Sequence, residues 1–271
     1  MSTPLPLLRS FSLALALAAS TAALAQPANS VHLEELTWTE LRDRVKAGAT
    51  TVIVPIGGTE QNGPAMVLGK HNVRVRLLGA RIAAGLGQAL VAPVVAYVPE
   101  GGIDPPTAHM RFPGTITIPE SAFETTLEYA ARSFRQHGFR DVVLIGDHGG
   151  YRRNLKRVAD KLNHEWAATP VRVHALDDYY QAVSEVHAAA LKARGFSDAE
   201  IGGHAGLADT SLSLALDPAL VRTERLKDGK AGRAEGVDGN PSRASAELGE
   251  LPAEHIVARS IAAIRRAVAR R

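Results

Sequence analysis

The sequence predicts an α/β fold of three layers, in which helices cover both faces of a mostly parallel central sheet. Short runs rich in β-branched residues alternate along the chain with longer segments of helical periodicity, which is typical of a layered α/β domain. The runs at 51–55, 89–92 and 141–145 are almost entirely apolar, as strands are when both of their faces are covered. In such a sheet, functional groups usually lie on loops beyond the carboxyl ends of the strands.

The individual elements follow from these two patterns. The expected strands are Thr51–Pro55, Ala89–Ala92, Thr115–Ile118, Asp141–Ile145 and Val171–His174. The expected helices are Thr39–Lys46, Val73–Leu86, Ser121–His137, Arg152–Trp166, Asp178–Arg194 and Ala253–Arg270. Residues 228–249 are rich in Gly, Ser, Asn and charge, which predicts a long surface excursion before the last helix. The chain shows neither a repeat nor a dividing linker, so we expect one domain over residues 26–271.

The first 25 residues have the composition of a secretory signal peptide. Arg9 ends a short positive region, an apolar run begins at Phe11, and Ala23-Leu24-Ala25 fits the small-x-small cleavage pattern. The apolar run is shorter than the ~20 residues that span a membrane comfortably. We therefore expect cleavage after Ala25 and a secreted or periplasmic protein without a membrane partner. An uncleaved membrane anchor and a buried N-terminal helix are the alternatives.

The composition limits the chemistry open to the chain. The absence of Cys excludes disulfides, thiolate metal ligands and a Cys nucleophile, so a bound metal would be held by His, Asp or Glu. The formal net charge is only +3, from 31 Lys and Arg against 28 Asp and Glu. Without a basic cluster, this small charge is weak evidence for nucleic-acid binding. We expect no nucleic-acid partner.

Four segments combine glycine with histidine or acidic residues, at 57–72, 108–115, 146–151 and 202–211. Their candidate functional residues are Glu60, Asn62, His71, His109, His148, Tyr151, His204 and Asp209. Each segment alone also has a purely structural interpretation. The first is then a solvated loop, His109 lies on the surface, His148 caps a helix or occupies a turn, and Asp209 caps the helix that follows it.

Taken together, the four segments resemble the ordered motifs of the creatininase (creatinine amidohydrolase) family. The family patterns are Gly-x-x-Glu-Gln-His-Gly-Pro-His-Leu-Pro-x-x-x-Asp, His-x-x-Phe-Pro-Gly-Thr, Asn-Gly-His-Gly-Gly-Asn and His-Ala-Gly-x-x-Glu-Thr-Ser. The stretch at 236–241 also resembles the family's Gly-Val-x-Gly-x-Pro. The resemblance covers nearly the whole chain after the expected signal peptide. It implies a creatininase-like α/β amidohydrolase with a site for one or two metal ions, often assembled into hexamers.

By position, the resemblance implies a ligand set of Glu60, Asn62, His71, His148 and Asp209, of which only Glu60 and His148 keep the family's residue. Asn62 replaces a His, His71 replaces a bridging Asp, and Asp209 replaces a Glu. One imidazole nitrogen cannot bridge two metals as a carboxylate does. These departures favour one ion over two.

The remaining set of Glu60, His71 and His148 has the ligand inventory of many mononuclear catalytic zinc sites. We therefore expect a divalent metal, with zinc favoured over manganese and iron. Asp209 is expected to be either a fourth ligand or the base that takes a proton from the metal-activated water.

The other candidate residues are expected to act on the substrate. Asn62 would bind the substrate carbonyl or bind the metal weakly. His204 resembles the family's histidine near the substrate and would transfer a proton to the leaving nitrogen. His109 and Tyr151 would belong to the substrate pocket.

Two functions follow from this reading. The first is metal-dependent hydrolysis of a non-peptide C–N bond in a small-molecule amide, such as a cyclic amide or a formamide-type compound, by attack of metal-activated water. The second is an inactive or altered family member that acts as a periplasmic small-molecule binding protein. The replaced residues are themselves polar ligands, which favours an altered but active enzyme.

Overall fold

A computed structural model describes residues 30–226 and 232–269, so the expected signal peptide at 1–25 lies outside the described residues. The centre of the molecule is a parallel sheet with the strand order β2-β1-β3-β4. The strands are β1 (Thr51–Ile56), β2 (Ala89–Val91), β3 (Asp141–Gly146) and β4 (Arg172–Ala175). The pairing of β1 with β3 runs from Thr51 and Asp141 to Ile56 and Gly146, so these two strands end side by side.

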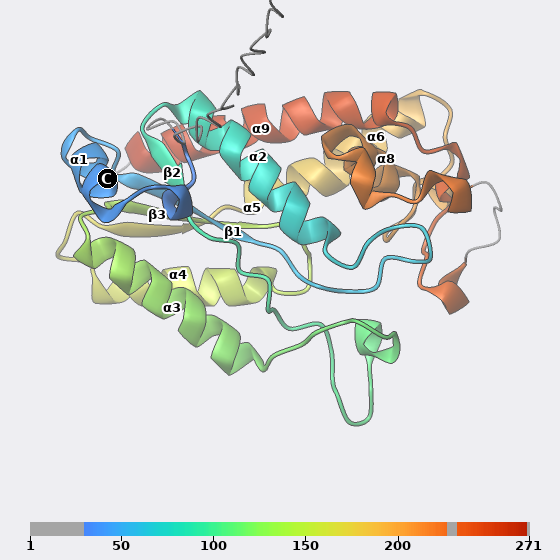
Figure 1. Cartoon of the computed structure of the whole chain (residues 1–271), viewed down its shortest axis with the longest axis horizontal. Coiled ribbons are helices and arrows are strands. Elements are labelled where there is room, and N and C mark those ends of the chain that lie inside the picture. The colour runs from blue at the N-terminus through green and yellow to red at the C-terminus, as the bar shows by residue number, and fades with distance from the viewer. Residues whose placement is uncertain (1–29, 227–231, 270–271) are drawn as a thin grey trace, which may run out of the picture.

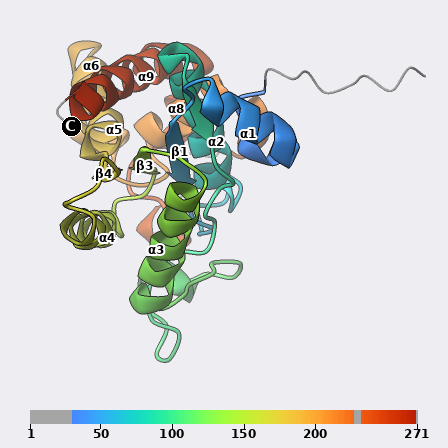
Figure 2. The same cartoon turned by 90° about the vertical axis from the view of Figure 1, so that its left-hand side faces the viewer.

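Helices cover both faces of the sheet, which confirms the three-layer α/β/α fold (Figures 1 and 2). The helices on one face are α3 (Glu120–Gln136) and α4 (Arg152–Glu165), and those on the other are α2 (Lys70–Leu86) and α9 (Ala246–Ala269). Successive strand residues point to opposite faces. Val52 accordingly packs with α3 and α4, whereas its neighbour Ile53 packs with α2 and α9.

The shorter helices are α1 (Trp38–Lys46), α5 (Asp177–Gln181), α6 (His187–Ala193), α7 (Asp198–Ile201) and α8 (Leu207–Leu216). A π-helical turn, η3 (Ala182–Val186), joins α5 to α6 within the segment expected to be one helix. A capping box between Thr37 and Glu40 begins α1, because each side chain binds the other residue's backbone N–H. In the part of the chain that the structure describes, no helix is long and apolar enough to cross a membrane.

Three expected boundaries differ from the structure. Residues 115–118 form no strand: Thr117 makes an isolated bridge with Val98, and the N–H of Ile116 donates to the carbonyl of Thr59 over 2.9 Å. Pro113 and Pro119, which have no N–H to give to a ladder, flank the segment. Helix α2 begins at Lys70, which places His71 in its first turn instead of on a loop. Helix α9 begins at Ala246 and contains Pro252, so the end of the expected surface excursion is helical.

A side chain from helix α4 satisfies backbone hydrogen-bonding groups on the outer side of the edge strand β4. Asn163 of α4 donates to the carbonyl of Val173 over 2.8 Å and accepts the N–H of Val173 over 2.8 Å. Its amide thus occupies the place of a fifth strand's backbone at this residue.

Candidate metal centre and active site

A cavity of about 450 Å³ lies where β1 and β3 end. The loop after β3 contributes Asp147 and His148 to its wall, and the first turns of α2 contribute Lys70, His71 and Arg74. His109 and His204 reach the same cavity from segments that are distant in the sequence. The structure therefore brings together residues from all four of the glycine-containing segments.

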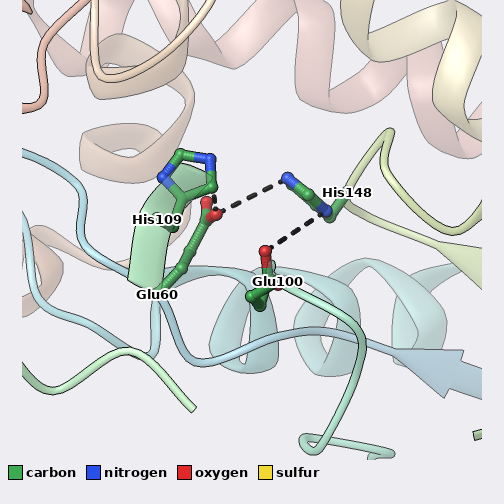
Figure 3. Close-up of side chains that lie close together, drawn as sticks. All are labelled: Glu60, Glu100, His109 and His148. Carbon is green, nitrogen blue, oxygen red and sulfur yellow. Dashed lines mark ion pairs between the residues drawn. The ribbon is translucent and has the colours of Figure 1, made fainter. Parts of the chain in front are cut away.

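Glu60 lies at the centre of this arrangement and is fully buried. Its Oε1 lies 2.8 Å from Nε2 of His71. Its Oε2 lies 3.2 Å from Nε2 of His109 and 3.5 Å from Nε2 of His148 (Figure 3). No hydrogen-bond partner satisfies Oε2, although both imidazole nitrogens face it. Burial acts to raise the pKa of Glu60, but the hydrogen bond and charge of His71 outweigh it and hold this pKa below its usual value.

A second buried carboxyl group, Glu100, lies beside this one. Its Oε2 is 3.8 Å from Nδ1 of His148, and neither of its oxygens has a hydrogen-bond partner (Figure 3). Burial, with the nearby charge of Glu60, raises the pKa of Glu100 to about 9. Glu100 is not among the functional residues expected from the sequence. The available signal was an acid between Pro99 and Gly101, downstream of a short apolar strand.

Four residues present ligand atoms that all lie within 4.8 Å of one another: Glu60, Glu100, His109 and His148. We call them the His/Glu cluster. Buried carboxylate oxygens without partners are costly unless a cation compensates them. Two carboxylates and two imidazoles are also a donor set suited to a divalent transition metal. The side chains present therefore fit a metal ion, and the cluster shares Glu60 and His148 with the expected ligand set.

His71 is placed differently from the expected ligand. Its Nε2 lies 2.8 Å from Glu60 and its Nδ1 lies 2.6 Å from Oδ2 of Asp147, so both ring nitrogens are engaged by carboxylates. Burial and Lys70 act to lower the pKa of His71, but the hydrogen bonds to the two carboxylates raise it overall. In this arrangement His71 orients Glu60 and offers no free lone pair to an ion.

Asp209 is also placed away from the His/Glu cluster. It lies in the first turn of α8, where it forms ion pairs with Lys70 and Arg74 and accepts the N–H of Ala205 over 2.9 Å. Both cationic side chains are 1% exposed. Burial acts to raise the pKa of Asp209, but the two positive charges hold it well below its usual value. Its carboxylate is therefore already neutralised by protein groups, which differs from the expected role as ligand or base.

Arg74 also pairs with Asp147, over 3.2 Å between Nε and Oδ2, and the hydroxyl of Tyr179 donates to Oδ1 of Asp147 over 2.8 Å. We call Lys70, Arg74, Asp147 and Asp209 the ion-pair network. Sequence reasoning assigned no role to Lys70, Arg74 or Asp147, because the charge of a helix or loop residue does not reveal that it will be buried.

Asn62 and Tyr151 do not line the cavity, contrary to their expected roles at the substrate. Asn62 is buried, and its amide donates to the carbonyls of Glu60 over 2.9 Å and Val67 over 3.0 Å, which fixes the shape of the loop after β1. The Tyr151 hydroxyl is buried 2.7 Å from the carbonyl of Gly57 and accepts the N–H of His148 over 3.1 Å. Each side chain thus supports the backbone beside a cluster residue.

His204 faces the cavity as expected. Its Nε2 lies 3.0 Å from the carbonyl of Gln61, and its Nδ1 lies 3.8 Å from Oε1 of Glu60. Burial, assisted by the charge of Lys70, lowers the pKa of His204 to about 4, so the ring is neutral near pH 7. His109 comes from a short 3₁₀ helix, η2 (Ala108–Arg111), and belongs to the His/Glu cluster instead of only to the pocket wall.

Comparisons with known proteins agree with this geometry. The family model for creatininase, described as creatinine amidohydrolase, matches residues 34–264. Creatinine amidohydrolase of Pseudomonas putida is 28% identical over 211 residues, which cover 73% of this chain and 76% of that protein. A 3-dehydro-scyllo-inosose hydrolase of Thermotoga maritima is 26% identical and a mycofactocin precursor peptide peptidase of Mycobacterium tuberculosis is 28% identical. The matches cover 72% and 66% of this chain, but only 58% and 63% of those two relatives.

Solved structures give the same result. A crystal structure of creatinine amidohydrolase superposes with a TM-score of 0.72 at 30% identity, over 89% of this chain and 98% of that one. A manganese creatininase gives a TM-score of 0.72 at 28% identity, and a mutant creatininase of the Zn–Zn type gives 0.68 at 28%, each over 88% of this chain. The two superpositions cover 99% of the manganese creatininase chain and 98% of the Zn–Zn chain. The chain therefore belongs to the creatininase family of amide-bond hydrolases.

Proposed function

We propose that this protein is a metal-dependent amidohydrolase that cleaves a non-peptide C–N bond in a small molecule, such as a cyclic amide or a formamide-type compound. The observation that carries the proposal is the convergence of Glu60, Glu100, His109 and His148, with unsatisfied carboxylate oxygens. The two histidines of this set also line the cavity. One relative is named as a peptidase, so kinship alone does not choose between peptide and non-peptide substrates. The cavity of about 450 Å³ has the size of a small-molecule site and favours the latter.

The four residues of the His/Glu cluster would hold the metal. When bound, a zinc, manganese or iron ion would polarise the amide carbonyl and lower the pKa of an attacking water. We favour one zinc ion. His71 and Asp209, which would be needed for a second ion, are engaged by Asp147 and by Lys70 and Arg74. Related structures are named as manganese and Zn–Zn creatininases, so the metal analysis should include manganese and a second zinc ion.

We assign the proton transfer to His204. If its Nε2–H donates to the carbonyl of Gln61, its Nδ1 carries a lone pair on the side of Glu60. The neutral ring accepts a proton from the attacking water at Nδ1 and delivers it to the leaving nitrogen. The water oxygen bonds to the carbonyl carbon, the C–N bond breaks, and the products are a carboxylic acid and an amine. His71 and Tyr151 keep Glu60 and His148 in position during this exchange.

The test uses the mature chain, residues 26–271, purified without chelator. We expect stoichiometric bound metal and metal-dependent release of amine from at least one member of a panel containing creatinine, hydantoin, 2-pyrrolidinone and N-formylglycine. His204→Gln should lower kcat by roughly 100-fold or more while metal content stays unchanged. His255→Gln, at an exposed position on α9, is the matched control. A protein that neither binds metal nor is activated by it would overturn the proposal, and tight metal-independent binding without turnover would support the binding-protein alternative.

We also propose export by cleavage after Ala25 and assembly into a homo-oligomer, with a hexamer expected from the family. The support is the composition of residues 1–25 and the resemblance described above. Mass spectrometry of the protein recovered from a periplasmic extract should give an N-terminus at Gln26. Light scattering of the same sample gives the assembly size, and a monomer would remove the second part of this proposal.

A further inference from the structure

The cavity is also lined by residues that do not belong to the His/Glu cluster or the ion-pair network. Tyr180, Ser184 and His187 line one wall of it from the continuous helical stretch α5–η3–α6. Their spacing of four and three residues places them on one face of that stretch. The π-helical turn η3 lies between the first and last of them, and such turns occur frequently at functional sites.

His187 is the unusual residue of this wall. Its side chain is 1% exposed, yet its Nε2 has no hydrogen-bond partner. A backbone hydrogen bond to Leu248 supports the ring. Leu248 lies four residues before Pro252 in α9, and proline has no N–H to give to that carbonyl. The carbonyl of Leu248 is thus available to the imidazole N–H, which leaves Nε2 as an acceptor.

A buried acceptor without a hydrogen-bond partner destabilises a protein. Burial also lowers the pKa of His187 to about 4, so the ring is neutral near pH 7 and Nε2 keeps its lone pair. Of the charged groups that influence it, which are Arg74, Asp209 and Arg194, the first two are paired with each other. Nε2 of His187 therefore presents one kind of recognition chemistry, which is that of a neutral acceptor for an N–H or O–H donor.

The wall is continuous with the catalytic side of the cavity. A methyl group built on Gly149 would lie 2.5 Å from the Tyr180 hydroxyl, which shows that this ring rests against the backbone next to His148. From there the wall passes Ser184, whose hydroxyl donates to the carbonyl of Tyr180 over 3.2 Å, and reaches His187. A molecule with its amide at His148 would extend its far end along this wall.

We propose that His187 is a specificity-determining residue that accepts a hydrogen bond from a donor group of the substrate, remote from the amide that is cleaved. The substrate class is then an amide with a second N–H or O–H group. This inference rests on the proposed hydrolase function for the identity of the cavity as a substrate site. The recognition itself is a binding property, and it is testable without turnover.

The test compares pairs of amides that differ only in the donor. 3-Hydroxy-2-piperidinone adds a hydroxyl to 2-piperidinone, and 4-hydroxy-2-pyrrolidinone adds a hydroxyl to 2-pyrrolidinone. Titration calorimetry on the metal-loaded mature chain measures binding, and amine release measures turnover. We expect the wild-type protein to prefer the donor member of at least one pair by roughly 3- to 10-fold in Kd or KM.

His187→Leu should remove that preference and leave kcat for the non-donor member within about twofold, whereas His187→Gln, which keeps an acceptor oxygen, should restore part of it. His255→Leu is the control for loss of a histidine outside the cavity. Thermal unfolding verifies that both His187 variants are folded, and the glutamine variant carries the test if the leucine variant is not.

The outcomes separate this inference from the proposed function. Donor preference in binding without any hydrolysis supports the role of His187 and contradicts the hydrolase. Hydrolysis without donor preference, or a preference that survives His187→Leu, overturns the role of His187 and leaves the hydrolase intact. If no member of either pair binds or reacts, the role of His187 is also overturned.

Discussion

The ion-pair network and the two histidines of the His/Glu cluster line the same cavity, but buried charge is compensated differently in the two groups. In the network, Lys70 and Arg74 face Asp147 and Asp209, and the charges compensate each other within the protein. In the cluster, the oxygens of Glu100 and Oε2 of Glu60 are buried without hydrogen-bond partners. The difference teaches that carboxylates near a cavity are not equivalent as candidate metal ligands. The unsatisfied group is the one whose charge an external cation would compensate.

The largest expected effect is at Glu60. Glu60→Gln replaces a charged oxygen by an amide at the centre of the cluster, so zinc affinity should fall by more than ~100-fold and amide hydrolysis should be lost. Competition with a chromogenic chelator measures the affinity. Glu254→Gln, at an exposed carboxylate on α9, is the control. Full metal content in Glu60→Gln would place the ion elsewhere and remove the distinction between the two regions.

The next effect is on stability and comes from the network. Asp209→Asn leaves Lys70 and Arg74 buried with too little negative charge, so the free energy of unfolding should fall by roughly 3–5 kcal/mol. Metal stoichiometry should remain that of the wild type. Urea unfolding and elemental analysis of the same sample test both statements. Loss of the metal with little loss of stability would instead make Asp209 a ligand.

A third prediction concerns Glu100 in the metal-free protein. Its pKa is raised to about 9 from 4.5, so the folded protein keeps a proton that the unfolded chain releases above about pH 4.5. Stability should therefore fall as pH rises from about 4.5 towards 9. Glu100→Gln should abolish this slope, which is on the order of 2 kcal/mol between pH 5.5 and 7.5, and should weaken zinc binding. An unchanged slope in chelator-treated samples would contradict the burial of an uncompensated carboxyl group.

The smallest effect is expected from His187, outside both regions. Its pKa is lowered to about 4 from 6.5, so its contribution to stability is fully present above pH 6.5 and is lost as pH falls from 6.5 towards 4. When the pH is lowered from 7.5 to 5.5, the free energy of unfolding of His187→Leu should fall by about 1 kcal/mol less than that of the wild type. Denaturant unfolding at the two pH values gives the difference. His255→Leu serves for comparison, and equal losses in all three proteins would refute the prediction.

The fold was largely predictable, because alternation of apolar strands with amphipathic helices encodes layers directly. The prediction of a strand at 115–118 was wrong, because β-branched residues favour an extended backbone even where no neighbouring strand pairs with it. The sequence did not indicate that α2 starts at Lys70, because the residue before it is Gly69, which has no side chain to cap the helix.

The site was only partly predictable. Glu60 and His148 follow the ends of β1 and β3, so their meeting can be read from strand order alone. The burial of Glu100, Lys70 and Arg74 depends on how loops and helices pack above the sheet. That packing produces no periodic pattern in the sequence. Tyr151 illustrates the converse, because its position next to the glycine-rich loop indicated the pocket while its hydroxyl is buried beneath the backbone.

The side-chain clamp that Asn163 places on Val173 also bears on how the protein behaves at high concentration. An open edge strand is a template on which another chain can add a strand, and this is one route to aggregation. Here an amide group from the protein's own helix already occupies the hydrogen-bonding positions of one residue in the middle of β4. Strand addition at this edge would therefore first have to displace Asn163 from Val173.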